Sequence, residues 1–384
     1  MTARHTFALV AGEASGDQLG AALIAELRKS CPGAQFVGIG GGAMRAAGME
    51  CWWDSEELAV FGLFEVLAHL PRLLRIRRQL LQRLRQQHLD AFIGIDAPDF
   101  NLGLEQRLKS RGVRTVHYVS PTIWAWRPGR IAKIVRAADL VLCLFPFEPA
   151  FYQGYGISAA YVGHPMADQI PLRNEAPVAR RKLGLKENSR LIALLPGSRA
   201  GEVSRLSTPM LEAAAMLSAQ HPDVGFVAAI ANPRAGSIFR QALAMQQRPE
   251  IRLIEGQPQT VMAASDVVIC ASGTAALEAM LINRPMVVAY RLATPTYVLA
   301  KTLSLVKSRF IALPNILAGQ PLVPELIQHD ATGPRLALEA ARWLQDRPAR
   351  IALQAQFEAL HRELLCGASH RAAGAIVSLI RRPS

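Results

Sequence analysis

The feature that most limits the fold of this chain is a regular alternation of short apolar runs with longer segments of helical periodicity. In the first half, the apolar runs cover residues 7–10, 35–39, 91–95, 115–119, 140–144 and 160–162. In the second half, they cover residues 191–195, 225–230, 251–254, 267–270 and 286–290. Because buried parallel strands are short, apolar and joined by helices, this alternation predicts βαβ units with helices on both faces of a parallel sheet.

A charged, proline-bearing segment at residues 168–189 separates the two sets of runs. A chain of 384 residues, 51% of them apolar, is long enough for two domains that each have a core. We therefore expect an α/β fold of two doubly wound, Rossmann-like domains that face a cleft. The first domain is expected over residues 1–169 and the second over 170–355, followed by helices over 356–384.

The formal charge of +13 predicts attraction to an anionic partner, but charge alone does not separate nucleic acid, anionic lipid and phosphorylated substrates. Aromatic residues make up only 6% of the chain and no nucleic-acid-binding motif appears, so nucleic acid is not expected. No run reaches the roughly 18 apolar residues of a membrane span, which predicts a cytoplasmic protein that does not cross the membrane. The five cysteines include no C-x-x-C pair and indicate neither a disulfide framework nor a zinc site.

Polar and glycine-rich segments come directly after the predicted strands. They are residues 11–17, 38–44, 95–100, 120–130, 163–165, 196–202 and 271–274. Ligands of doubly wound sheets bind outside the carboxyl ends of the strands, so these segments predict a ligand site at that edge. For residues 38–44, a turn that merely needs glycine is the better interpretation.

In the second domain, Gly273 marks a tight turn from a strand into a helix, whose first amides lack intrahelical partners. These amides, with the hydroxyls of Ser272 and Thr274, suit phosphate oxygens. Glu278 lies one helical turn after Thr274 and could accept hydrogen bonds from a ribose diol. An ordinary strand-turn-helix corner with Glu278 on a solvated face fits this stretch equally well.

The segment PGSR places Ser198 and the guanidinium of Arg199 after another strand, where both could contact a diphosphate. The two segments together predict a nucleotide-diphosphate site that uses no metal. The chain has no carboxylate cluster suited to Mg²⁺, no Walker sequence and no G-x-G-x-x-G after the first strand, and no cofactor is expected.

In the first domain, Asp96 ends a predicted strand, and Pro98 is expected to keep Ala97 extended. The Asp96 carboxylate would then face the cleft and could remove a proton from a hydroxyl nucleophile. Asp99 is an alternative base, or else caps a helix that begins near Phe100.

A second polar cluster in this domain is formed by Glu13, Ser15 and Asp17, which are expected either in the cleft or, for the last two, as helix caps. His117 and His164 are further acid or base candidates, although a lone histidine is more often structural. Trp124 and Trp126 could stack on a sugar or belong to the core.

A basic stretch at residues 71–88 alternates six arginines with leucines and isoleucine and contains no acidic residue. It predicts either an interfacial helix on an anionic membrane or a packed surface helix with a solvated arginine face. The candidate membrane contacts are Leu73, Leu74, Arg75, Arg78 and Leu81.

Taken together, the segments AGEASGD, GIDAPDFN, HYVSPTIWAWR, GHPMAD, LLPGSR, ASGTAALEAML and LPNILAG resemble the lipid-A-disaccharide synthase family. These enzymes are GT-B glycosyltransferases of Gram-negative outer-membrane biogenesis. The resemblance runs in order from about residue 8 to residue 330 and is weak only over the last fifty residues.

The resemblance implies transfer of a sugar, with inversion, from UDP-2,3-diacylglucosamine to 2,3-diacylglucosamine 1-phosphate (lipid X), giving the β-1,6 disaccharide and UDP. It assigns Asp96 as the base, Arg199 to the diphosphate and Glu278 to the ribose. It also places Glu13, Ser15 and Asn315 in the cleft.

The resemblance further implies that the final helix, near residues 371–380, crosses back onto the first domain. It favours contact of residues 71–88 with the anionic inner-membrane surface, and it leaves a homodimer open. A UDP-sugar epimerase of the same fold is the alternative, and it would need no acceptor.

Overall fold

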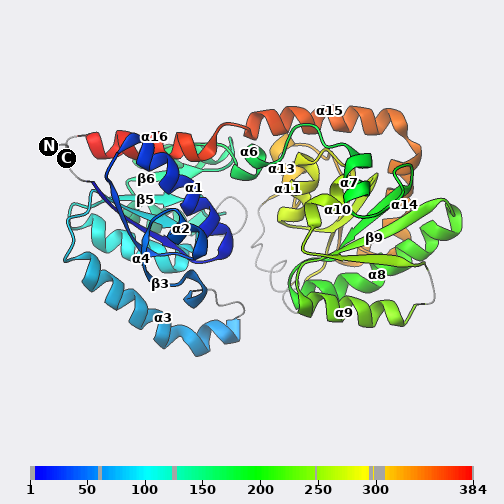
Figure 1. The fold of residues 1–384 in the computed structure, drawn as a ribbon, viewed down its shortest axis with the longest axis horizontal. Helices are drawn as coiled ribbons and strands as arrows, with labels where there is room; N and C mark the ends of the chain where they lie inside the picture. The colour runs from blue at the N-terminus through cyan, green and yellow to red at the C-terminus, as the bar shows by residue number, and fades with distance from the viewer. Residues whose placement is uncertain are drawn as a thin grey trace. The chain divides into compact units, whose positions relative to one another are not determined.

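The computed structural model describes residues 5–58, 63–122, 128–246, 249–293, 297 and 308–382. The chain divides into two compact units (Figure 1). Unit 1 comprises Met1–Asp168 and Leu364–Ser384, and unit 2 comprises Gln169–Glu363. The sequence-based division placed these boundaries at residues 169 and 355. Helix α15 runs unbroken from Arg347 to Leu364, so residue 355 lies within this helix.

Unit 1 contains a seven-stranded sheet in the order β3-β2-β1-β4-β5-β6-β7. All neighbouring strands pair in parallel. The strands are β1 (Thr6–Ala11), β2 (Gln35–Ile39), β3 (Glu50–Trp53), β4 (Ala91–Ile95), β5 (Arg114–Tyr118), β6 (Leu140–Cys143) and β7 (Ser158–Tyr161). The α-helices are α1 (Ala14–Ser30), α2 (Gly42–Ala46), α3 (Leu63–Leu84), α4 (Pro98–Lys109), α5 (Ile131–Ala137), α6 (Pro165–Gln169, which ends one residue beyond the boundary) and α16 (Ala368–Arg381).

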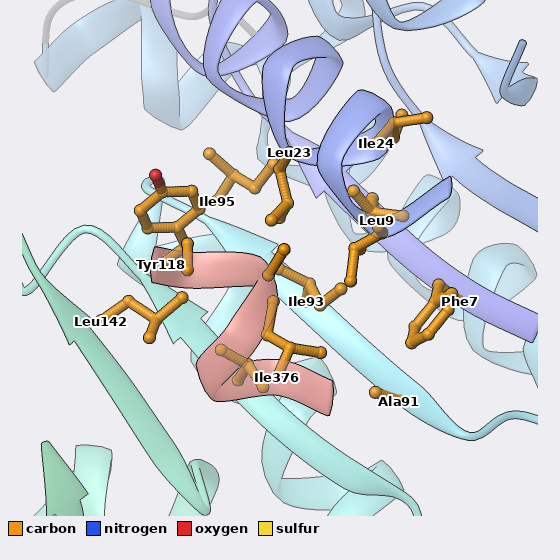
Figure 2. Packing of buried hydrophobic residues seen from close by; sticks show 14 of the residues in the cluster. Phe7, Leu9, Leu23, Ile24, Ala91, Ile93, Ile95, Tyr118, Leu142 and Ile376 are labelled. Carbon is orange, nitrogen blue, oxygen red and sulfur yellow. The ribbon is translucent and has the colours of Figure 1, made fainter. Parts of the chain in front are cut away.

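Alternate residues of β1 point to opposite faces of this sheet, because side chains alternate along a strand. Phe7 and Leu9 pack in a cluster with α1 and α16, whereas Ala8 and Val10 pack in a cluster with α3 and α4. Figure 2 shows Ile376 of α16 beside strand residues of the first cluster. The last helix of the chain thus packs against the first helix and completes the core of unit 1.

Helix α3 covers the opposite face of the sheet and corrects one expectation. Ile76, Leu80, Leu81 and Leu84 are buried in its cluster, and Leu81 is only 5% exposed. Leu81 therefore belongs to the core and is not a membrane contact. The helix ends at Leu84, four residues before the expected end.

Unit 2 contains a six-stranded parallel sheet in the order β10-β9-β8-β11-β12-β13. Its strands are β8 (Arg190–Leu195), β9 (Val224–Ile230), β10 (Ile251–Glu255), β11 (Val267–Ala271), β12 (Met286–Tyr290) and β13 (Glu325–Ile327). Its α-helices, besides α15, are α7 (Ala176–Lys182), α8 (Ala200–Gln220), α9 (Pro233–Ala244), α10 (Pro258–Ala264), α11 (Thr274–Leu281), α13 (Leu313–Ala318) and α14 (Gly333–Gln345). The expected fold class, α/β with two parallel-sheet domains, is confirmed.

Candidate active site

A pocket of about 400 Å³ lies at the carboxyl ends of the central strands of unit 2. Strands β8 and β11 are adjacent and parallel, so the loops that follow them meet at one edge of the sheet. Six residues predicted for nucleotide binding line this pocket: Ser198, Arg199, Ser272, Gly273, Thr274 and Glu278. The structure therefore brings together all the predicted site residues of this domain except Asn315.

The backbone of the two loops explains their glycines. Gly197 has φ 114°, and a Cβ added there would lie 2.8 Å from Oε2 of Glu202. Gly273 has φ 148° and precedes α11 without any side-chain cap. The first amides of α11 are thus left to a ligand, and the positive end of the helix dipole favours an anionic one.

Three charged side chains line the pocket: Arg199, Glu202 and Glu278. Burial raises the pKa of Glu278, and a hydrogen bond with Gln259 partly opposes this shift. Arg199 forms an ion pair with Glu202 at 3.3 Å, and its side chain is largely exposed. Its remaining guanidinium donors can therefore reach a bound anion.

In unit 1, Asp96 lies directly after β4 with its side chain exposed. Its N–H donates to the carbonyl oxygen of Tyr118 at 2.8 Å, and its own carbonyl oxygen accepts from Nδ2 of Asn101 at 2.8 Å. The expectation that Ala97 is extended was wrong. Asp96 and Ala97 have φ 50° and 42°, both in the left-handed region, and Pro98 begins α4.

The segment after β1 lies beside this turn. Strands β1 and β4 are paired, and a Cβ added at Gly12 would lie 2.9 Å from Cβ of Ala97. Glu13 and Ser15 are exposed at this edge. The structure therefore brings Glu13, Ser15 and Asp96 to the carboxyl ends of two adjacent strands.

Asp99 lies in the first turn of α4, where both its carboxylate oxygens accept hydrogen bonds from Nη2 of Arg130, at 2.8 and 3.0 Å. A neighbouring cation favours the ionised carboxylate but also occupies its oxygens. Of the two candidate bases, Asp96 is therefore the better placed to accept a proton.

Asp17 is structural, contrary to the expectation that it binds substrate. Its carboxylate is 6% exposed and accepts hydrogen bonds from the N–H groups of Gly41, Ala43 and Met44. Asp17 therefore caps the start of α2. The glycine-rich segment at residues 38–44 contains the capped N–H groups and forms the turn into this helix.

Asn315 is also structural. It is 1% exposed, and its Oδ1 accepts from the N–H groups of Leu322 and Val323. Its Nδ2 donates to the Val323 carbonyl oxygen and to Oε1 of Glu325. With its hydrogen-bonding groups occupied, Asn315 holds Glu325, which accepts from the N–H groups of Ile311 and Ala312 near Ser272.

Neither histidine is placed as an acid or base. His117 is buried and its Nδ1 lies 2.7 Å from Oε1 of buried Glu105. Burial lowers the pKa of His164 to about 4, and its Nδ1 accepts from the Met166 N–H. Trp124 and Trp126 lie outside the described residues.

Five residues that the sequence did not single out contribute to these sites: Asn101, Arg130, Glu202, Gln259 and Glu325. Glu202 belongs to the predicted segment 196–202, and Asn101 directly follows segment 95–100. Arg130 is the last residue of the predicted segment 120–130, whereas Gln259 and Glu325 lie outside every predicted segment. The sequence pattern therefore gave no signal for Gln259 and Glu325.

The helix expected to contact a membrane has an exposed apolar edge. Leu70 and Leu74 are 41% and 44% exposed, and Leu73 is half-buried. Arg75 and Arg78 are exposed and form no ion pair with any residue that the structure describes. Among the described helices, none combines the length and apolarity required to cross a bilayer.

The described part of the chain also contains no group of three or more His, Cys, Asp or Glu side chains arranged to hold a metal ion. All five cysteines are free thiols.

Solved structures share the whole fold at low sequence identity. UDP-GlcNAc 2-epimerase from Neisseria meningitidis superposes with a TM-score of 0.66 at 13% identity, covering 97% of this chain and 100% of that protein. The calicheamicin glycosyltransferase superposes with a TM-score of 0.60 at 14% identity, covering 99% of each chain. At this identity the similarity establishes the GT-B fold alone.

Sequence comparison identifies the family. The chain is 52% identical over 376 residues to lipid-A-disaccharide synthase of Xanthomonas campestris pv. campestris strain 8004, covering 97% of this chain and 86% of that protein. It is 52% identical over 377 residues to lipid-A-disaccharide synthase of Xylella fastidiosa strain M12, covering 98% of each. Residues 7–376 match the family described as lipid-A-disaccharide synthetase. These matches do not favour the epimerase alternative, and the chain belongs to the lipid-A-disaccharide synthetase family.

Proposed function

We propose that this protein transfers 2,3-diacylglucosamine from its UDP donor to the 6-hydroxyl of 2,3-diacylglucosamine 1-phosphate, with inversion. The products are the β-1,6-linked disaccharide 1-phosphate and UDP. The observation that carries the proposal is the unit 2 pocket, because its lining suits a nucleoside diphosphate. Membership of this family supports the same substrates.

The donor binds in this pocket. The diphosphate lies against the uncapped amides of α11 and within reach of Arg199, while the Glu278 carboxylate accepts hydrogen bonds from the ribose. Negative charge grows on the diphosphate as the glycosidic bond breaks. Fixed N–H dipoles and a cation placed at that position stabilise the transition state more than the bound donor.

The acceptor binds at the carboxyl edge of the unit 1 sheet, with Glu13 and Ser15 as polar contacts. Asp96 removes the proton from the acceptor hydroxyl as its oxygen attacks the anomeric carbon. A single displacement of this kind places the new bond on the opposite face from the departing UDP, so the configuration inverts. The exposed carboxylate of Asp96, held on a fixed turn, supports this role.

The protein works from the cytoplasmic side, bound peripherally to the inner membrane through α3. Both substrates carry acyl chains, and the exposed Leu70 and Leu74 lie on the same helix as the exposed Arg75 and Arg78. Burial of the leucines at the boundary between lipid headgroups and acyl chains, together with attraction of the arginines to anionic lipid, supports reversible attachment of the protein to the membrane.

A two-substrate assay tests the function. Detergent-dispersed donor should release UDP only when the lipid acceptor is present, whereas an epimerase would turn over the donor alone. Asp96→Asn should lower turnover by roughly 10² to 10⁴ while UDP affinity stays near wild type. Near-normal turnover of this variant would remove Asp96 as the base.

A further inference from the structure

The turn between β4 and α4 carries an unusual concentration of backbone strain. Asp96 and Ala97 are consecutive non-glycine residues with positive φ, and Val119, at the end of adjacent β5, has φ 79°. Side chains with a Cβ are disfavoured in this region and persist there only when the surrounding structure holds them. The strained residues lie at the carboxyl ends of the two strands beside the proposed base.

One buried side chain holds this turn. Asn101 is 0% exposed, and its Nδ2 donates to the carbonyl oxygen of Asp96 at 2.8 Å. The same nitrogen has longer contacts with the carbonyl oxygens of Val10, at 3.3 Å, and Ile95, at 3.4 Å. Since Tyr118 accepts from the Asp96 N–H, both backbone groups of Asp96 are fixed and only its carboxylate is left to face solvent.

The position requires a hydrogen-bond donor. Every acceptor around Nδ2 is a backbone carbonyl, while Oδ1 of Asn101 is buried and has no partner among the residues that the structure describes. Leaving a buried oxygen unpaired is unfavourable, so packing alone does not explain an amide at this site. Gly94 makes room for it, because a Cβ there would lie 2.8 Å from Cβ of Asn101.

We infer that Asn101 is a positioning residue for the transfer reaction. It ties the ends of β1 and β4 to the Asp96 carbonyl and so keeps the carboxylate in the orientation that accepts the hydroxyl proton. The inference rests on the proposed role of Asp96 and adds the residue through which the fold controls that role.

The first test compares Asn101→Ala with Leu104→Ala. Leu104 is buried on the same helix and faces the core, so its truncation destabilises unit 1 without touching the turn. At a temperature where both variants are folded, Asn101→Ala should lower kcat by about 10- to 100-fold, because small misplacements of a reacting group have effects of this size. KM for the donor and UDP affinity should stay within twofold. Equal losses of kcat in the two variants would overturn the inference.

The second test is a double-mutant cycle with Asp96→Asn. If Asn101 acts through Asp96, Asn101→Ala should slow wild type strongly but change the already slow Asp96→Asn enzyme by less than about twofold. Full additivity would overturn the positioning role while leaving Asp96 as the base. Near-normal turnover of Asp96→Asn alone would instead contradict the proposed function.

A third variant covers the case in which Asn101→Ala does not fold. Ala97→Gly relieves the left-handed strain, because glycine adopts positive φ readily. The combined variant Ala97→Gly/Asn101→Ala should then fold but remain at least about tenfold slower than Ala97→Gly, because the carboxylate is no longer held. A combined variant as fast as Ala97→Gly would overturn the inference.

Discussion

At the scale of single residues, Glu278 links the nucleotide pocket to pH. Burial raises its pKa above the ordinary value of 4.5, so its carboxylate takes up a proton at a higher pH than an exposed glutamate does. A protonated Glu278 loses part of its capacity to accept hydrogen bonds from the ribose.

We predict that Glu278→Gln weakens UDP binding by up to about 1.5–3 kcal/mol at pH 8, the range of a hydrogen bond to a charged group. Lowering the pH toward 5 should weaken wild-type binding more than it weakens the variant. Calorimetric titrations at both pH values measure this difference. Glu250→Gln, an exposed residue just before β10, is the matched control and should behave as wild type. Identical pH dependence of Glu278→Gln and wild type would place the ribose elsewhere.

His164 supplies a prediction about stability. Its pKa is about 4 in the folded protein, against an ordinary value of 6.5, because burial disfavours the charged ring. Between these values the unfolded chain binds more protons than the folded one, so the free energy of unfolding falls as the pH drops from 6.5 toward 4.

His164→Asn should reduce this loss of stability between pH 7 and pH 5, because asparagine does not take up a proton in this range. Its side-chain oxygen can still accept from the Met166 N–H. Denaturant midpoints at the two pH values measure it. His88→Asn removes an exposed histidine from the same unit and should leave the wild-type difference unchanged. A His164→Asn variant that loses as much stability as wild type would show that other groups carry the acid sensitivity.

The sequence was informative about residues at strand ends and less so about what each polar residue contacts. Ser198, Arg199, Ser272, Thr274 and Glu278 could be placed together because parallel strands carry their following loops to one edge. In the sequence, Asp17 and Asn315 resembled these site residues. In the structure, the Asp17 carboxylate accepts from the Gly41 N–H, and Oδ1 of Asn315 accepts from the Leu322 N–H, so both are occupied by the backbone of other segments. Periodicity carries no information about such contacts.

At the scale of elements, eleven strands were anticipated, and the two missed strands are short and lie at sheet edges. β3 is half-buried and begins with Glu50, and β13 has only three residues. Edge strands carry less apolar sequence because one side has no neighbour to pack against, so the apolar-run signal weakens there.

Helix α3 also shows what periodicity leaves open. Its leucines spread around the helix, and only burial separates Leu80, Leu81 and Leu84, which face the sheet, from Leu70 and Leu74, which face outward. Leu70 and Leu74 are therefore the residues to replace in a test of membrane contact.

Leu70→Ser/Leu74→Ser should release the protein from anionic vesicles without lowering its melting temperature. Higher salt should weaken wild-type binding without abolishing it, because screening acts only on the arginines, each worth about 1 kcal/mol at such a surface. Vesicle co-sedimentation measures both effects. Leu338→Ser, which alters a 63% exposed leucine on α14, is the matched control and should still bind. Undiminished binding of the double variant would argue against α3 as the contact.

At the scale of the whole molecule, one of the two units is built from two separate stretches of the chain. Unit 2 is continuous in sequence, whereas unit 1 needs α16 from the far end of the chain. Ile376 is fully buried among residues of β1, β4 and β5, and Asp168 accepts hydrogen bonds from the N–H groups of Gly367 and Ala368 at the start of α16. Stability of unit 1 therefore depends on a segment that is separated from the rest of the unit by the whole of unit 2.

We predict that Ile376→Asp unfolds unit 1 selectively. The variant loses about 1.5–3 kcal/mol of stabilisation from apolar burial. It also places an unpaired carboxylate in the core, which destabilises the unit further. Typical domain stability is only about 5–15 kcal/mol. Hydrogen exchange should show lost protection over β1, β4 and β5, while unit 2 amides stay protected and UDP still binds there. Ser378→Asp places the same charge on the exposed side of α16 and should leave both units protected. Loss of protection in both units of Ile376→Asp would contradict the prediction and show that the two units unfold as one cooperative structure.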